Sequence, residues 1–318
     1  MKKEYIIGIL VILILAVIAF MVNDLFLSKS SQNNPYELST DSLKKIDPNL
    51  IGYKEIYQIQ TTMDELNGIA IDKNDNIVVA GSKLIVYNKN YKEIKSCKLT
   101  EVSNCIAVNS NNEIFMGVQS HIEVRNMQGE FLRRWKCGNN ESILTGIAVD
   151  DANVFVADAA ESLLHQYDVN GKFINNIGKE DSLNGVPAVI IRSPFFDVAI
   201  GRDNEIWMVN PGMYQLEAFD KKGNLKSSWG KPSDEIDGFC GCCNPTHIAL
   251  LSDGSFVCSE KAIPRVKIYS QTGVFSCVVA GPNQFEDGTK GLDLAVDSKN
   301  RIYVLDPVRK QIRIFEKK

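Results

Sequence analysis

The chain has 318 residues, of which 44% are hydrophobic and 23% are charged, and its formal net charge is -4. This is an ordinary globular composition, long enough for one large domain or two small ones. The charge balance, together with the lack of a basic run interleaved with aromatic residues, argues against nucleic acid as a partner.

The first 27 residues differ from the rest of the chain. Lys2 and Lys3 precede an uncharged apolar run over residues 5–22, and about 18 helical residues just cross a hydrocarbon core of ~30 Å. The run ends in Phe-Met-Val-Asn, with no lipobox-type cysteine after it, which favours an uncleaved signal anchor over a cleaved signal peptide. The two lysines predict a cytoplasmic N-terminus. We therefore expect a single-pass membrane protein with an extracytoplasmic C-terminal domain, secreted if the segment is cleaved.

Residues 28–50 form a polar stretch with two prolines. Such a composition is typical of a tether that holds a domain away from a membrane. The domain that follows is expected outside the cytoplasm, where disulfides are permitted.

A short pattern then recurs six times, as GIAID, CIAVN, GIAVD, DVAIG, HIALL and DLAVD, starting at residues 68, 105, 146, 197, 247 and 293. Each copy precedes a turn rich in Asp, Asn, Gly or Ser, then a second apolar run and a third run that usually ends in an aromatic residue. Short β-branched segments between turn residues indicate strands. Four strands in each unit of about 40–50 residues predict the blade of a propeller.

The two ends of the repeat region predict how the ring closes. The sixth unit has only three strands before the chain ends, and one extra strand, residues 52–60, precedes the first unit. Its addition as the outer strand of the sixth blade would remove an open sheet edge. The sequence thus predicts an all-β, six-bladed β-propeller over residues 51–318, closed by an N-terminal strand and preceded by one N-terminal helix.

The repeat pattern over residues 52–318 resembles that of the NHL-repeat family of six-bladed propellers. That resemblance implies the fold, and the family includes binding modules, scaffolds and a few lyases and lactonases. The segment GCCNPTHIALLSDGSFVCSEKAIPRVKIY is also similar to a narrower set of bacterial secreted propellers that contain GCCNP.

Polar residues gather where the first strand of each blade starts and the second ends, which is one mouth of the channel. Blades three to six supply all of these acids and amides, and the three longest loops enter blades four to six. Long loops on a rigid scaffold are where binding sites usually lie. The predicted ligand site comprises Asp158, Asp197, Asn210, His247, Glu260, Lys261, Arg265, Asp293, Asp306 and Arg309.

These acids have two interpretations. They are either turn residues that bond to their own backbone, or part of a site for Ca²⁺ or another divalent cation, which takes oxygen ligands. Regucalcin- and gluconolactonase-like propellers bind such an ion through a Glu, two Asn and an Asp, a set that this chain matches only in part. The metal hypothesis names Asn210, His247, Glu260, Asp293 and Asp306.

The stretch DGFCGCCNPTH, residues 237–247, concentrates Cys240, Cys242 and Cys243 next to His247. We favour structural disulfides, with Cys242 joined to Cys243 and Cys240 to Cys258, over metal ligation or redox-active thiols. Thioredoxin-like chemistry requires a C-x-x-C motif at the start of a helix, and the sequence predicts no helix at this stretch.

The motif search points to binding rather than catalysis. The chain has no G-x-S-x-G, no H-E-x-x-H and no phosphate loop. We expect a membrane-tethered binding or assembly module that takes a protein or small-molecule ligand at the mouth of blades three to six. The alternatives are a metal-dependent hydrolase or lyase of the lactonase-like type, and a thiol-disulfide redox or electron-transfer accessory protein that uses the CGCC loop.

Overall fold

The computed structural model describes residues 3–22 and 43–318, except 184, 242 and 243. Two compact units cover residues 1–42 and 43–318. In the first, α1 (Lys3–Val22) is one continuous α-helix. Within the described residues, no helix combines the length and the hydropathy needed to span a membrane. Residues 28–42 of the predicted tether lie outside the described residues.

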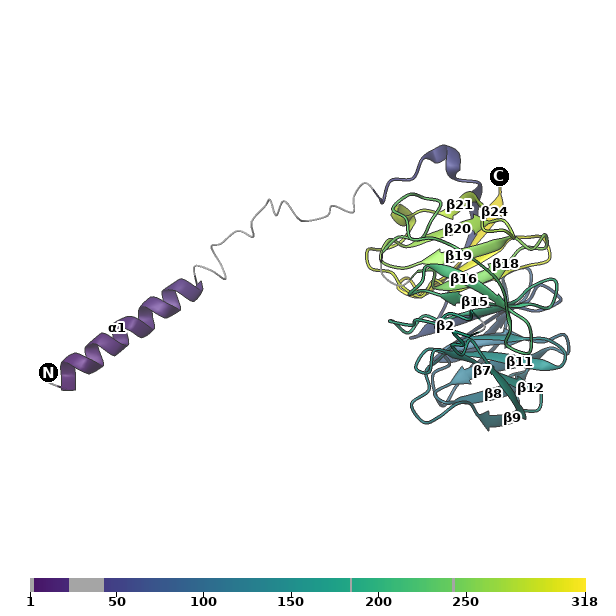
Figure 1. The fold of residues 1–318 in the computed structure, drawn as a ribbon, viewed down its shortest axis with the longest axis horizontal. Helices are drawn as coiled ribbons and strands as arrows, with labels where there is room; N and C mark the ends of the chain where they lie inside the picture. The colour runs from purple at the N-terminus through teal and green to yellow at the C-terminus, as the bar shows by residue number, and fades with distance from the viewer. Residues whose placement is uncertain (1–2, 23–42, 184, 242–243) are drawn as a thin grey trace. The chain divides into compact units, whose positions relative to one another are not determined.

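The second unit is a six-bladed β-propeller whose blades are antiparallel four-stranded sheets (Figure 1). Blade one comprises β2 (Leu66–Ile71), β3 (Ile77–Gly81), β4 (Lys83–Tyr87) and β5 (Glu93–Lys98). Blade two comprises β6 (Cys105–Val108), β7 (Glu113–Val118), β8 (His121–Asn126) and β9 (Phe131–Lys136). Blade three comprises β10 (Leu144–Val149), β11 (Asn153–Asp158), β12 (Leu163–Asp168) and β13 (Phe173–Ile177).

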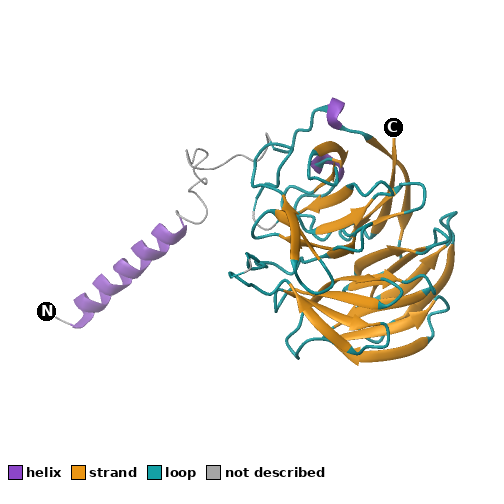
Figure 2. Ribbon diagram, turned by 45° about the vertical axis from the view of Figure 1, so that its right-hand side comes forward, coloured by secondary structure: helices purple, strands orange, loops and turns teal. Residues whose placement is uncertain are grey.

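The remaining blades follow the same order. Blade four comprises β14 (Val198–Ile200), β15 (Ile206–Asn210), β16 (Gln215–Phe219) and β17 (Leu225–Trp229). Blade five comprises β18 (His247–Leu250), β19 (Phe256–Glu260), β20 (Arg265–Tyr269) and β21 (Phe275–Ala280). Blade six comprises β22 (Leu294–Val296), β23 (Ile302–Asp306), β24 (Gln311–Lys317) and β1 (Tyr53–Gln60). Strands and loops make up almost all of the described part of this unit (Figure 2). Its described residues include two 3₁₀ turns, η2 (Pro48–Leu50) and η3 (Pro282–Gln284).

Ring closure follows the prediction. β1 pairs antiparallel with β24 from Tyr53 opposite Lys317 to Gln60 opposite Gln311. Arg313 donates from Nε and Nη2 to the two carboxylate oxygens of Glu55, at 2.8 and 2.6 Å. The first and last strands of the propeller are therefore joined by backbone pairing and by a two-pronged ion pair.

The apolar core lies between neighbouring blades. The second strands are the most buried, and β3, β15, β19 and β23 have no exposed residue. The outermost strand of blade one, β5, is exposed along most of its length. Trp135 packs against Gly171 of the next blade, and Trp229 packs against Gly273. A Cβ at Gly273 would approach the Trp229 ring to 2.6 Å, so only glycine allows this blade-to-blade contact.

A chain covering residues 43–318 is expected to unfold cooperatively, whereas a chain covering residues 61–318 is expected to lose the fold. Deletion of β1 leaves β24 with an unpaired edge and exposes the apolar side chains that β1 covers. That loss is comparable with a whole domain's stability of about 5–15 kcal/mol. Thermal unfolding by circular dichroism and gel filtration measure the difference. Equal melting and a monomeric elution for both chains would show that closure by β1 is dispensable.

Candidate functional site

The starts of the first strands and the ends of the second strands lie at one mouth of the channel, as the repeat register predicted. Leu144 pairs with Asp158 in blade three, and His247 pairs with Ser259 in blade five. In blade one, Leu66 pairs with Gly81 at the corresponding position. Each entry loop therefore opens onto this mouth.

A hollow of about 400 Å³ occupies the mouth. We call it the mouth pocket, and its lining includes Asn67, Asn104, Thr145, Phe195, His247 and Lys290, one from each blade or its entry loop. Blades one and two therefore contribute amide side chains that the sequence analysis missed. Asn67, Asn104 and Thr145 each stand one position before a repeat start, and that position was the signal available.

His247 is the most distinctive residue of the mouth pocket. It is 6% exposed, and its Nδ1 is buried without a hydrogen-bond partner. Burial lowers its pKa to about 4, so the imidazole is neutral at pH 7 and one of its nitrogens carries a lone pair. The Phe195 ring meets it edge-to-face, with centroids 5.9 Å apart. The Lys261 ammonium lies over the same Phe195 ring, 5.3 Å from its centroid.

Asp197 and Asp293 brace neighbouring blades. Asp197 Oδ2 accepts the Ile248 N–H at 2.9 Å, which joins blades four and five. Asp293 Oδ2 accepts the Ile69 N–H at 2.8 Å, which joins blade six to blade one. Both carboxyls line the narrow channel below the mouth pocket. Burial and the nearby Asp293 charge raise the pKa of Asp197 well above its ordinary value, and burial raises the pKa of Asp293 to about 7.

The polar residues that end the second strands are buried and partnered inside their own blades. Asp158, Asn210, Glu260 and Asp306 are at most 1% exposed. Each contacts the side chain seven positions later on the third strand, as Asp158–His165 at 3.2 Å, Asn210–Glu217 at 2.8 Å, Glu260–Lys267 at 2.7 Å and Asp306–Arg313 at 3.9 Å. A ligand in the mouth pocket does not reach these four side chains as the structure places them.

Of the predicted basic residues, two contact acidic side chains of their own blades and one lies beside the mouth pocket. Arg265 is 1% exposed and donates from Nε to Glu260 at 2.5 Å, so it belongs to the buried pairs. Arg309 Nη1 donates to the Gln284 carbonyl at 2.6 Å and lies 3.6 Å from Asp306. Lys261 remains beside the mouth pocket through its contact with Phe195.

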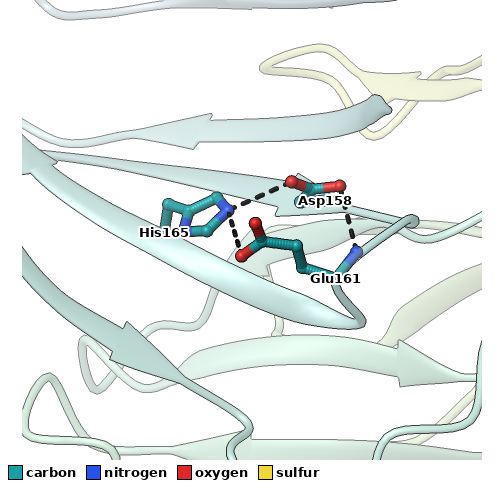
Figure 3. Close-up of side chains that lie close together, drawn as sticks. All are labelled: Asp158, Glu161 and His165. Carbon is teal, nitrogen blue, oxygen red and sulfur yellow. Dashed lines mark hydrogen bonds and ion pairs between the residues drawn. The ribbon is translucent and has the colours of Figure 1, made fainter. Parts of the chain in front are cut away.

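The side chains named in the metal hypothesis do not form one ligand group. His247 lines the mouth pocket, Asp293 faces the channel and bonds to Ile69, and Glu260 and Asp306 are paired with Lys267 and Arg313. Among the described residues, one group of three His, Cys, Asp or Glu side chains has its ligating atoms within 4.8 Å of one another. It consists of Asp158, Glu161 and His165 (Figure 3).

That group is already hydrogen-bonded. His165 Nδ1 lies 2.9 Å from Asn176 Oδ1, and its Nε2 lies 3.2 Å from Asp158 Oδ2 and 3.7 Å from Glu161 Oε2. The pair also has the register of Glu260–Lys267 and Asp306–Arg313, in which a basic side chain neutralises a buried acid. We therefore interpret Asp158–His165 as the ion pair of blade three.

The cysteine prediction is corrected in part. Cys240 and Cys258 are both free thiols, so the predicted bridge between them is not formed. Cys242 and Cys243, the predicted vicinal pair, lie outside the described residues. Asn244 fastens this loop instead, because its Oδ1 accepts the Lys261 N–H at 2.9 Å and its Nδ2 donates to the Cys240 carbonyl at 2.6 Å.

Asp293→Asn is expected to remove part of the pH dependence of stability. The pKa of Asp293 is raised to about 7 in the folded chain from 3.8, so the folded state holds the proton longer and stability falls as pH rises from about 4 to 7. The slope of the free energy of unfolding is up to about 1.4 kcal/mol per pH unit. Urea unfolding at several pH values measures it, with the exposed Asp64→Asn as a control. An unchanged slope in Asp293→Asn would contradict the assignment.

Comparisons with known proteins give the fold alone. No protein-family model matches the chain, and no curated protein matches it in sequence. A solved streptogramin B lyase has a TM-score of 0.59 at 11% identity, covering 84% of this chain and 98% of that one. Virginiamycin B lyase from Staphylococcus aureus has a TM-score of 0.55 at 13% identity, covering 79% and 81%. A catalytically inactive variant of that lyase with quinupristin has a TM-score of 0.55 at 12% identity, covering 83% and 99%. The chain is a six-bladed β-propeller structurally similar to these lyases.

Proposed function

We propose that this chain is a membrane-tethered, extracytoplasmic β-propeller that binds a small organic ligand in the mouth pocket. The observation that carries the proposal is His247, a buried neutral imidazole that lines the pocket and whose Nδ1 has no partner. The repeat pattern, which resembles that of the NHL family, is compatible with a binding module of this kind.

Burial of the His247 ring without a partner for Nδ1 costs free energy. A buried donor or acceptor without a partner costs about 1–3 kcal/mol, and the cost is recovered if a bound molecule orders or completes the polar contacts around the ring. The volume of about 400 Å³ is in the range of small-molecule pockets, about 300–1,000 Å³. Phe195 supplies an apolar wall, whereas Asn67, Asn104 and Thr145 are polar lining residues. The Asn67 amide and the Thr145 hydroxyl already donate to backbone carbonyls, so they would accept hydrogen bonds from a ligand. We expect a compact ligand with one apolar side and several polar atoms.

A second candidate function is a lyase or hydrolase that uses His247 as a proton acceptor. The pKa of about 4 leaves the ring unprotonated at pH 7 but makes it a weak base, so this function requires a bound substrate that raises the pKa of His247. The similar solved structures include lyases, but at 11–13% identity they support the fold rather than the reaction. A thiol-redox role stays a proposal that rests on Cys242 and Cys243, which lie outside the described residues.

His247→Ala is expected to weaken ligand binding in the mouth pocket about tenfold or more, because loss of one hydrogen bond and the ring contact is worth at least about 1.4 kcal/mol. Saturation-transfer NMR with a library of small organic fragments measures it. Gln271→Ala is the matched control, since Gln271 lines a different hollow of about 210 Å³. Fragments that bind both variants equally, or a library that yields no binder to the wild type, would count against the mouth pocket.

The membrane tether is tested separately. We propose that the segment over residues 1–27 is an anchor, on the basis of its apolar run and the preceding lysines. The full-length chain is expected to stay in the membrane pellet after alkaline carbonate washing, whereas a chain that starts at residue 43 is released. Intact mass of the purified protein supplies the control for cleavage. A mature protein that begins after the apolar run would replace the anchor with a signal peptide.

A further inference from the structure

The buried pairs of blades three to six share a task, which is to hold the loop that enters their own blade. Asn210 accepts the Ile190 N–H at 3.0 Å in blade four. Lys267 donates to the Gly238 carbonyl at 2.6 Å in blade five, and Arg313 donates to the Gln284 carbonyl at 2.6 Å in blade six. These entry loops surround the mouth, so the pairs fix the walls from beneath.

In blade three the pair holds the segment before β10. Asp158 Oδ1 accepts the Ile143 N–H at 3.0 Å, and Ile143 and Thr145 line the mouth pocket. The backbone of Gly138 closes over the pair. A Cβ on that glycine would come within 3.0 Å of Asp158 Oδ2 and 3.1 Å of His165 Nε2. The 138–145 segment therefore rests directly on Asp158 and His165.

Blade three differs from blades five and six in its basic partner. Lysine and arginine keep their charge near neutral pH, whereas histidine loses its proton in that range. Both ring nitrogens of His165 face oxygen atoms, of Asn176 and of Asp158, and the doubly protonated ring satisfies both contacts as they stand. Deprotonation removes the positive charge that neutralises the fully buried Asp158.

We propose that the Asp158–His165 pair is a proton-operated latch on the mouth pocket. With His165 protonated, Asp158 stays paired and holds the 138–145 segment in place. When His165 loses its proton, Asp158 keeps the N–H groups of Ile143, Ala160 and Glu161 but loses the positive charge that neutralises it, and the segment loosens. The effect on ligand binding rests on the proposed function, whereas the loosening of the segment does not.

The groups around His165 favour the charged ring. Burial lowers the pKa of His165, but the hydrogen bonds to Asp158 and Asn176 and the charges of Asp158 and Glu161 raise it overall. The other titratable neighbours are neutral, since burial raises the pKa of Cys137 to about 12 and the pKa of Tyr167 above its ordinary value. A raised histidine pKa adds stability below about pH 6.5 that is lost as pH rises through the folded-state value.

Hydrogen-exchange mass spectrometry of the full-length chain in detergent tests the latch without any ligand. After correction for the intrinsic pH dependence of exchange, protection of residues 138–145 is expected to fall about tenfold between pH 5.5 and 8.5. His165→Gln, which cannot be charged, is expected to show low and flat protection. His165→Arg, which copies blade six, is expected to show high and flat protection if it folds.

Two matched variants isolate the effect. His121→Gln changes a histidine of blade two, and Asp293→Asn removes the channel carboxyl that titrates near pH 7. Both are expected to keep the wild-type pH dependence at residues 138–145. A flat wild-type profile, or a His165→Gln profile that follows the wild type, would overturn the latch. One zinc ion bound per chain and lost in His165→Gln, but not in His121→Gln, would also overturn it, because the group would then hold a metal.

Discussion

The six blades can pack against one another only if the ring is closed. Each blade buries both faces of its inner strands against its two neighbours, so no blade is stable with one neighbour missing. The chain meets this requirement by pairing β1 with β24 and by fastening Glu55 to Arg313. Closure then fixes the six first strands around one channel and directs six entry loops to one mouth.

The closed ring buries polar residues that a looser fold would leave in water, and most of them have partners nearby. Asp197 and Asp293 accept backbone N–H groups from the next blade. Glu260 and Asp306 are paired with basic residues on the adjacent strand. Most of the acidic side chains that were predicted at the mouth are therefore engaged in contacts within the propeller. What is left for a ligand is His247, Phe195 and a rim of amides, a hydroxyl and a lysine.

The mouth pocket and the buried pairs are physically continuous. The entry loops form the walls of the pocket, and the pairs hold those loops from below. A change in charge at a pair is therefore transmitted to the wall through one or two hydrogen bonds. Among the four pairs, Asp158–His165 is the one whose basic partner is a histidine, and it is therefore the pair at which we propose that protonation acts.

Local chemistry explains which predictions were correct. The six-fold pattern of apolar strands and turn residues was enough to predict the blades, their order and the closing strand, because a four-strand unit that recurs six times has few other solutions. The same pattern placed His247, Asp197 and Asp293 near the mouth and channel. It could not show that Asp158 and Glu260 point into their own blades, because their partners stand seven residues away on another strand.

The cysteines and the metal hypothesis show the same limit of prediction from residue spacing. Cys240 and Cys258 are close in sequence and belong to one blade, yet their thiols remain free and Asn244 fastens the loop. The spacing of residues in the sequence shows which side chains could come into contact, but side-chain direction and burial determine which of them do. A closed six-bladed ring and the location of its mouth could be predicted from the amino-acid sequence, because the repeats and the extra strand at the N-terminal end can be counted there. Which of the predicted residues line the mouth pocket depends on the folded structure, because the buried charged side chains pair with partners on other strands and blades.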